Sequence, residues 1–326
     1  MNNFINIINA PWAIEPGKLL EIQAIYATRL RGEKIDLEAI EKRLGRPLAN
    51  EPKAFDIIDG VAVLPIEGII AKRMNLFTQI SGGTSTQIAA QSLQSALLDP
   101  SVHSIILSID SPGGTVDGTE ALANAVHAAR LQKPVVTLAS GTICSAAYWI
   151  GSAAQSVFLA DGTTQAGSIG VVSTHTDISG SQAAQGVKTS EITAGRYKRI
   201  ASNYAPLSEE GRQTIQNQVD YTYSLFVEAV AKNRGVSTAT VLRDMADGKV
   251  FVGKQAIDAG LADGIVTMPN LVSMLNKDRT AAKAASASAA NRPKTRAELD
   301  QAAKNYMRSR PGTDYLSAVK AVERLA

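Results

Sequence analysis

The sequence contains a single cysteine, Cys144, and few aromatic residues. One cysteine excludes an intrachain disulfide framework and a cysteine-rich zinc site. Aromatic residues make up 5% of the 326 residues, as in α/β proteins whose Ala, Val and Ile side chains pack against a sheet. A chain of this length can bury a sizeable core. We therefore expect one main domain with appendages.

The sequence also lacks a large excess of either charge. It has 33 basic and 30 acidic residues, a net charge of +3, which argues neither for nor against nucleic acid as a partner. The first residues have no positively charged region, and Pro11 and Pro16 follow short apolar runs that asparagines interrupt. This start is a poor signal peptide, and we expect a cytoplasmic protein.

Charge is absent altogether from residues 134–160. The many serines, threonines and glycines of this stretch argue against a transmembrane helix, which needs a predominantly apolar span. The better interpretation is a buried strand over 135–139, a turn over 140–144 and a helix that opens at Ser145. A hydroxyl at the start of a helix lies beside unpaired backbone N–H groups and the positive end of the helix dipole. Ser145 is therefore a candidate nucleophile.

The residues before this stretch alternate between apolar strands and helices. We predict strands over 61–70 and 104–110 and helices over 87–98 and 118–130. This alternation predicts βαβ units and a largely parallel sheet. Active sites in such sheets lie at the carboxyl ends of the strands, where both the Ser-Pro-Gly-Gly turn at 111–114 and the Ser145 turn fall.

The rest of the chain predicts a strand near 188–193, an amphipathic helix over 208–233, and a helix and turn over 252–263 that lead into a strand at Ile265. After Asn276 the composition becomes rich in Ala and Ser, basic, and poor in large apolar residues, which is typical of a linker. A capping box at Thr295 and Glu298 then starts a helical hairpin. Such a hairpin is more often a docking element than a catalytic one.

These patterns divide the chain into four parts. We predict a helical N-terminal extension over 1–55, an α/β domain over 56–270, a flexible linker over 271–296 and a C-terminal helical hairpin over 297–326.

The two turns at the sheet edge suit acyl transfer, which needs an activated nucleophile and backbone donors for an oxyanion. Gly113 and Gly114 can offer N–H groups because no Cβ blocks the approach. The N–H of Ala146 lies beside Ser145 at the helix start.

The residues alone leave the base open between a histidine and a lysine. His103 and His127 are expected to be structural or solvated, whereas His175 could form a triad with Asp177 or Asp220. Lysine is the other choice: Lys198 follows a predicted strand and a glycine, and Lys188 is expected to be a solvated strand-edge residue.

Five motifs carry a family resemblance. The chain resembles the S49 serine peptidases (protease IV and signal peptide peptidase A) over residues 58–268, in the order and spacing of Ser111-Pro112-Gly113-Gly114, Ala139-Ser140-Gly141-x-x-Cys144-Ser145-Ala146-Ala147-Tyr148, Gly167-Ser168-Ile169-Gly170-Val171, Gly195-x-x-Lys198 and Gly253-x-x-Ala256-x-x-x-Gly260-Leu261-x-Asp263. The start Pro11-Trp12-Ala13-Ile14 makes it most similar to the phage and prophage capsid-maturation branch. One departure is Ala146-Ala147, where many relatives have Gly-Gly; backbone donation survives that change.

The resemblance implies a ClpP/crotonase-like α/β fold with repeated ββα units and a Ser-Lys dyad of Ser145 and Lys198. It also implies an oxyanion hole from Gly114 and Ala146, with Gly113 and Ser168 as candidates for supporting roles. No cofactor and no metal are implied. The expected assembly is a ring-like homo-oligomer whose dyads are completed across subunits, and the expected substrates are scaffold, capsid or portal proteins inside the procapsid.

Three alternatives stay open on the sequence. The first is a soluble host protease of the same family that degrades proteins and peptides. The second is a crotonase-like acyl-CoA enzyme, although the acidic catalytic residues and adenine pocket of that class have no counterpart here. The third is a non-catalytic assembly factor whose tail, residues 296–326, recruits capsid subunits.

Overall fold

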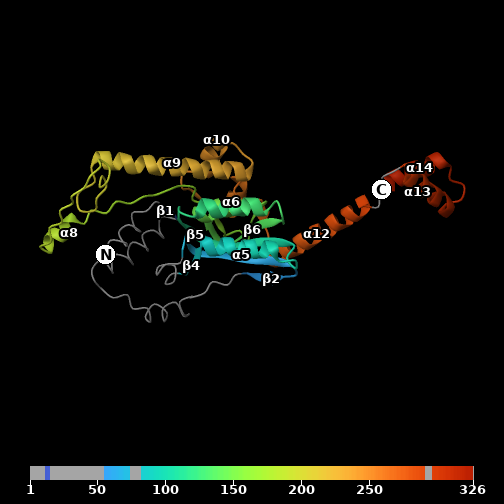
Figure 1. The fold of residues 1–326 in the computed structure, drawn as a ribbon, viewed down its shortest axis with the longest axis horizontal. Coiled ribbons are helices and arrows are strands. Elements are labelled where there is room, and N and C mark those ends of the chain that lie inside the picture. The colour runs from blue at the N-terminus through green and yellow to red at the C-terminus, as the bar shows by residue number, and fades with distance from the viewer. Residues whose placement is uncertain (1–11, 15–54, 74–81, 291–295, 326) are drawn as a thin grey trace. The chain divides into compact units, whose positions relative to one another are not determined.

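The computed structural model describes residues 12–14, 55–73, 82–290 and 296–325 (Figure 1). The chain divides into two compact units, residues 1–268 and 269–326. The predicted N-terminal helices lie outside the described residues, and so does Thr295 of the predicted capping box. Within the first 54 residues the structure describes one strand, β1 (Trp12–Ile14).

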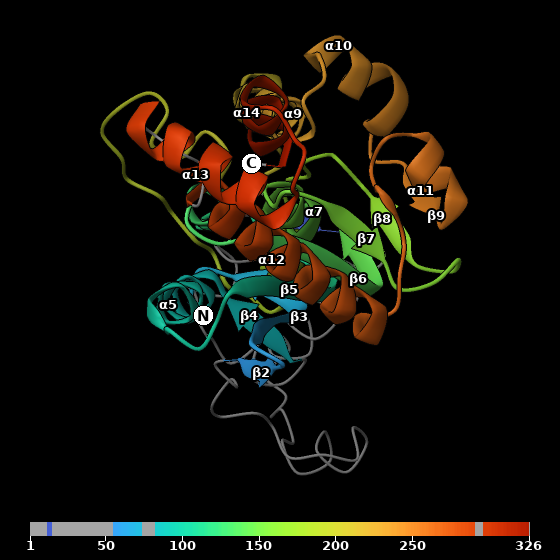
Figure 2. The ribbon, with the colours of Figure 1, turned by 90° about the vertical axis from the view of Figure 1, so that its right-hand side faces the viewer.

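The first unit is built on one sheet with a parallel centre. Its main path runs β10-β7-β6-β5-β3-β2, and Figure 2 shows β7, β6, β5 and β3 side by side. The pairs from β10 to β3 are parallel, while β2 is antiparallel to β3. The strands on this path are β2 (Asp56–Ile58), β3 (Val61–Ala71), β5 (Ser104–Thr115), β6 (Val135–Cys144), β7 (Val157–Leu159) and β10 (Gly264–Ile265).

Short strands extend this sheet at its carboxyl edge. β4 (Gly83–Ser85) pairs with the end of β3, and β8 (Gln165–Gly167) pairs with the end of β6. β9 (Val250–Val252) pairs antiparallel with β8, and β1 pairs antiparallel with the end of β5. The predicted α/β fold with a largely parallel sheet is confirmed.

Helices follow the strands as the sequence patterns predict. The first unit contains α5 (Thr86–Leu98), α6 (Thr119–Ala129), α7 (Ala146–Ser152), α8 (Ser179–Ala184), α9 (Glu209–Arg234), α10 (Thr238–Thr240), the π-helical turn η1 (Val241–Met245) and α11 (Lys254–Asp258). The Ser208 hydroxyl caps α9 by accepting the N–H of Gly211 at 3.1 Å, which satisfies one of the donors left free at a helix start.

One hydrophobic core lies between the sheet and these helices. The predicted amphipathic helix α9 buries Phe226 and Val230 in this core. The ring of Phe226 stacks on that of Trp149 in α7, with centroids 4.7 Å apart and planes 9° apart. Aromatic pairs add specific attraction to the burial of their surface. The stack therefore holds α9 against the short helix that follows Ser145.

Some expectations about local structure are wrong. Residues 111–114 and 140–144, expected to form turns, are the ends of strands β5 and β6. The predicted strand at 188–193 is absent. These residues are exposed, form no regular structure and pair with no strand among the described residues. The predicted linker is helical through most of its length, since α12 spans Met268–Ala290. Its alanine-rich composition, which cannot build a core, nevertheless has high intrinsic helix propensity.

The second unit continues from α12 into the predicted helical hairpin. The hairpin consists of α13 (Arg296–Ser309) and α14 (Tyr315–Leu325), and Tyr315 on α14 donates a hydrogen bond of 2.8 Å to Asp300 on α13. Ala303 and Ala318 are buried.

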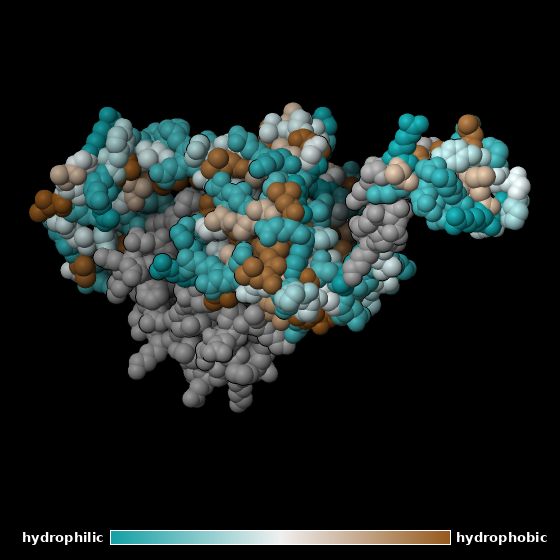
Figure 3. All heavy atoms as spheres, turned by 45° about the vertical axis from the view of Figure 1, so that its right-hand side comes forward, coloured by the Kyte–Doolittle hydropathy of each residue, from teal (hydrophilic) through white to brown (hydrophobic). Residues whose placement is uncertain are grey.

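The surface in Figure 3 mixes hydrophilic and hydrophobic residues. Among the described residues, no helix combines the length and the apolar character needed to cross a membrane.

Candidate active site

Ser145 lies at the junction of β6 and α7 in a strained backbone conformation. Its φ of 56° and ψ of −121° lie outside the regions that side-chain-bearing residues favour. A serine on such a strand-to-helix turn is a known way to present a nucleophile. The Ser145 hydroxyl is buried and has no hydrogen-bond partner in the part of the chain that the structure describes. An unpaired buried hydroxyl costs free energy, which points to a functional reason for its place.

Backbone hydrogen bonds fix the Ser145 turn on both sides. The Ser145 amide donates to the Gly167 carbonyl at 2.8 Å, and the Trp149 amide donates to the Ser145 carbonyl at 2.9 Å. Cys144 also pairs with Gly167 in the ladder between β6 and β8. The turn is therefore held by the strand that begins the Gly-Ser-Ile-Gly motif.

The Ser-Pro-Gly-Gly motif lies within the neighbouring strand, β5, near its carboxyl end. Ladder pairing between Ser111 and Ile143 brings it beside the residues that lead into Ser145. The Ser111 hydroxyl donates to the Gly68 carbonyl at 2.6 Å and accepts the Gly113 amide at 3.1 Å. The Gly113 N–H is thus already engaged, and Gly113, with a φ of 106°, shapes the loop.

Gly114 packs so closely on β3 that no other residue fits there. A Cβ at this position would lie 1.8 Å from the Ile70 carbonyl oxygen. Ala146, the other predicted donor, is the first residue of α7 and is buried. Its N–H is one of those that a helix start leaves without an intrahelical partner.

Lys198 is not joined to Ser145 within the single chain. It is exposed in the segment between α8 and α9, and its amide donates to the Gly195 carbonyl at 3.0 Å. Figure 1 shows this segment, in yellow, at the end of α9 opposite α10. Ion pairs of Arg199 with Glu191 and of Arg196 with Glu210 flank Lys198.

The histidine alternatives do not form a triad with Ser145 in the described residues. A His175 ring nitrogen lies 2.9 Å from the Ser202 carbonyl oxygen. Asp177 accepts the Ser179 amide at 2.9 Å, and hydrogen bonds from the Ser179 side chain and then from its amide lower the pKa of the Asp177 carboxyl. Asp220 is exposed on α9 and accepts a bond from Gln216 at 2.6 Å.

The other two histidines have structural contacts, as expected. One His103 ring nitrogen lies 3.0 Å from the Ser104 hydroxyl. His127 lies 3.3 Å from the Asn233 side-chain oxygen, and burial, followed by the charge of Arg130, lowers its pKa. The exposed Lys188 is likewise not bonded to Ser145.

Ser168 lies in a left-handed backbone conformation after β8. Its φ is 52°, it is buried, and its amide donates to the Lys249 carbonyl at 2.6 Å. This bond ties the residue after β8 to the segment before β9.

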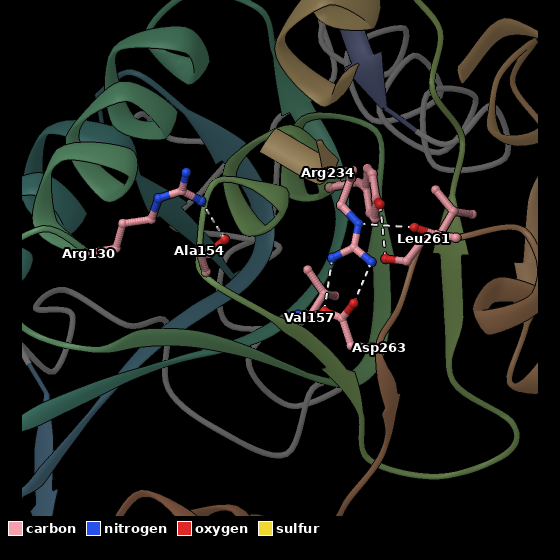
Figure 4. Close-up of polar contacts among 8 residues, drawn as sticks. Arg130, Ala154, Val157, Arg234, Leu261 and Asp263 are labelled. Atoms are coloured by element: carbon pink, nitrogen blue, oxygen red, sulfur yellow. Dashed lines mark hydrogen bonds and ion pairs between the residues drawn. The ribbon is translucent and has the colours of Figure 1, made fainter. Parts of the chain in front are cut away.

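A buried polar cluster behind α7 was not predicted as part of the site. The Tyr148 hydroxyl donates to the Leu261 carbonyl at 2.9 Å, and burial raises the pKa of Tyr148 far above its usual value. Arg234 donates to the same turn through the Gly260 carbonyl, at 3.0 Å. Figure 4 shows these contacts beside the end of α9.

Asp263 completes that cluster. Both of its oxygens accept from the Arg234 guanidinium, at 2.9 and 2.7 Å, and one also accepts the Val157 amide at 2.7 Å. Burial acts to raise the pKa of Asp263, but the Arg234 and Val157 bonds outweigh it and the pKa is lowered. The Gly260-Leu261-x-Asp263 motif was the sequence signal for this cluster.

The described residues contain no group of three or more His, Cys, Asp or Glu side chains that could hold a metal ion.

Two family sequence patterns match the chain. That of Peptidase family S49 matches residues 127–282, and that of Clp protease matches residues 64–164. Among solved structures, a ClpP1 mutant from Listeria monocytogenes is similar at 14% identity and a TM-score of 0.40, covering 63% of this chain and 91% of that one.

Several relatives are named as proteases. The chain is 34% identical to capsid assembly protease C of Escherichia phage lambda, over 69% of this chain and 51% of the relative. It is 34% identical to the head-tail preconnector protein of an enterobacterial phage, over 68% and 44%. It is 30% identical to a putative protease of Methanocaldococcus jannaschii, over 79% and 78%. The chain thus spans about half the length of its two phage relatives.

Proposed function

The chain belongs to peptidase family S49, and on that basis we propose that it is a serine endopeptidase with Ser145 as its nucleophile. The observation that carries the proposal is the strained, buried Ser145 turn with an unpartnered hydroxyl, beside the glycine loop of β5. Gly114 and Ala146 are the proposed oxyanion donors. Gly113 and Ser168 support them, because their amides hold the loops on either side.

The proposed reaction is acyl transfer in two halves. The Ser145 Oγ attacks the peptide carbonyl carbon while its proton passes to the neutral Lys198 amine. The oxyanion accepts the Gly114 and Ala146 N–H groups. The C–N bond then breaks, the leaving amine takes the proton from the Lys198 ammonium, and an ester remains on Ser145. Water attacks this ester, again giving a proton to Lys198, and the proton returns to Ser145 as the carboxylic acid leaves.

We propose that the base comes from a second copy of the chain. Lys198 is exposed, whereas Ser145 is buried and not bonded to it in the single chain. A lysine ordinarily titrates near 10.4, and acting as a base near neutral pH requires a shift of about 3 units, or about 4 kcal/mol. Desolvation at a subunit contact is a physical means of supplying such a shift.

Proteins of a phage procapsid are the proposed substrates. Two relatives at 34% identity are named as a capsid assembly protease and a head-tail preconnector protein. We propose scaffold, capsid or portal proteins as substrates and the host cytoplasm or procapsid as the place of action. The 56–270 domain is proposed to carry the peptidase, and the hairpin at 297–326 to serve in docking.

The test combines labelling with substrate processing. A fluorophosphonate probe should label the wild-type protein on Ser145 and leave Ser145→Ala unlabelled. Capsid and scaffold proteins co-expressed with the wild type should show new termini by mass spectrometry that are absent with Ser145→Ala. Labelling without capsid processing would favour a general peptide-degrading protease, and an unlabelled wild type would refute the peptidase.

A further inference from the structure

Strand β1 lies in the midst of the candidate site. Trp12, Ala13 and Ile14 pair antiparallel with Thr115, Gly114 and Gly113 of β5, in a ladder at the glycine loop. On its other side, Trp12 exchanges two backbone hydrogen bonds with Val172, of 2.8 and 2.9 Å. We call this place between the end of β5 and Val172 the β1 position.

In the part of the chain that the structure describes, β1 covers the edge of β5 that faces away from β3 at Gly113 and Gly114. At its carboxyl end β5 is paired with β3 on one side, through Gly113 and Gly114. On the other side its pairing with β6 ends at Ser111, because β6 turns at Cys144 into Ser145. Beyond that point β1 takes the place of β6. An exposed strand edge binds extended peptides by adding them as a further strand.

The backbone polar groups of β1 at Ala13 face Gly114, the proposed oxyanion donor. The N–H and C=O of Trp12 both face Val172. Neighbouring residues of a strand direct these groups to opposite sides, so those of Ala13 face β5, where its ladder partner is Gly114.

The side chains of β1 show what the position accepts. Trp12 and Ile14 are each 3% exposed. Residues two apart in a strand point to the same face, so an aromatic and a branched aliphatic side chain are buried together on one side of β1.

We propose that β1 occupies the place of the substrate backbone, and that an extended protein segment binds by displacing it. A substrate segment with a large aromatic and a branched aliphatic residue two positions apart would reproduce the contacts of β1. This inference rests on the proposed peptidase, since it assigns the strand that lies across its active site.

Ala13→Pro tests the proposal because proline removes the N–H that faces β5 and leaves the buried Trp12 and Ile14 in place. Losing this hydrogen bond should make β1 easier to displace from Ser145. We therefore expect fluorophosphonate labelling of Ser145 to become about tenfold faster, which corresponds to the net free energy of about one hydrogen bond. Ile57→Pro is the matched control, because β2 is also a three-residue strand antiparallel to its neighbour but lies at the far edge of the sheet. Its labelling rate should stay at the wild-type value.

A binding measurement separates this proposal from the peptidase itself. A fluorescent peptide with the sequence of residues 10–16 should bind Ser145→Ala more weakly than the double variant Ser145→Ala with Ala13→Pro. Both variants carry Ser145→Ala, so this measurement does not depend on hydrolysis. Weaker binding to Ser145→Ala than to the double variant would uphold the β1 proposal even if the wild type proved not to be a peptidase. Equal binding, or slower labelling of a folded Ala13→Pro protein, would overturn it and make β1 a structural support.

Hydrogen exchange on the wild type covers the case in which Ala13→Pro does not fold. Adding the same peptide should speed exchange of the Trp12 amide, which is bonded to Val172 in the free chain. Unchanged exchange of that amide with the peptide bound, or no binding of the peptide at all, would contradict the displacement.

Discussion

The amide of Ser145 donates a 2.8 Å hydrogen bond to the carbonyl of Gly167. This bond links the end of β6 to the end of β8 and holds the serine in its strained conformation, with φ at 56°. The same turn leaves the Ser145 hydroxyl buried without a partner. Backbone bonds thus hold the site, while the Ser145 hydroxyl makes no hydrogen bond among the described residues.

Replacing Ser145 should therefore separate activity from stability. We expect Ser145→Ala to lower peptide hydrolysis by at least about a thousandfold. The free energy of unfolding should stay equal or rise by about 1 kcal/mol, because an unsatisfied buried hydroxyl is removed. Urea denaturation and peptidase assays on the same preparations measure both. A loss of stability of several kcal/mol would mean that the hydroxyl has a structural partner.

Gly114 should tolerate no side chain. In Gly114→Ala the new Cβ would lie 1.8 Å from the Ile70 carbonyl oxygen, so β3 or β5 has to move. We expect a loss of roughly 3 kcal/mol or more in the free energy of unfolding, together with loss of fluorophosphonate labelling. Gly162→Ala is the control, because nothing lies within 4 Å of the Cβ it would add. Its stability should change by less than about 0.5 kcal/mol.

The bond between Arg234 and Asp263 should make stability depend on pH in the acid range. The pKa of Asp263 is lowered from its ordinary value of 3.8, so its ion pair stabilises the fold above that pH. The contribution is lost as the pH falls through the lower, folded-state pKa. At pH 7 Asp263→Asn should lower the free energy of unfolding by about 1–2 kcal/mol. This lies in the lower part of the range for hydrogen bonds to charged groups, because Asp263 is partly exposed to solvent.

Chemical denaturation at several pH values checks this dependence. The difference between wild type and Asp263→Asn should narrow as the pH is lowered below about 4. Asp258→Asn removes the exposed pair with Lys254 and should change stability by less than about 0.5 kcal/mol. A difference that stays constant from pH 7 to pH 2 would show that the charge of Asp263 is not what stabilises the turn.

The strands that carry the nucleophile could be predicted from local pattern. The uncharged stretch around Ser145 and the Ser-Pro-Gly-Gly motif are visible in the sequence, but residues 111–114 and 140–144, predicted as turns, are the ends of strands β5 and β6. The observed ladder between Ser111 and Ile143 places these ends on neighbouring strands. The family motifs supplied the assignment of Lys198, which spacing alone left open against His175.

What could not be predicted depends on contacts distant in sequence. The pairing of Trp12 with Val172 has no local signal, because three residues are too short for a period-2 pattern to stand out. The segment at 188–193 has some strand-forming residues but pairs with no strand among the described residues. The helix over the predicted linker shows that lack of core-forming residues does not remove helix propensity.

In the proposed assembly, one subunit provides Ser145 and another provides Lys198. The most direct test of this arrangement is complementation between Ser145→Ala and Lys198→Met chains that carry different tags and are purified together as one assembly. Each variant alone should be inactive; turnover by Lys198→Met would move the role of base to His175 or Lys188. If sites form across a head-to-tail contact, about a quarter of the contacts in a randomly mixed ring hold both intact residues, and about that share of wild-type activity should return. A mixed assembly as inactive as its two parents would contradict this arrangement.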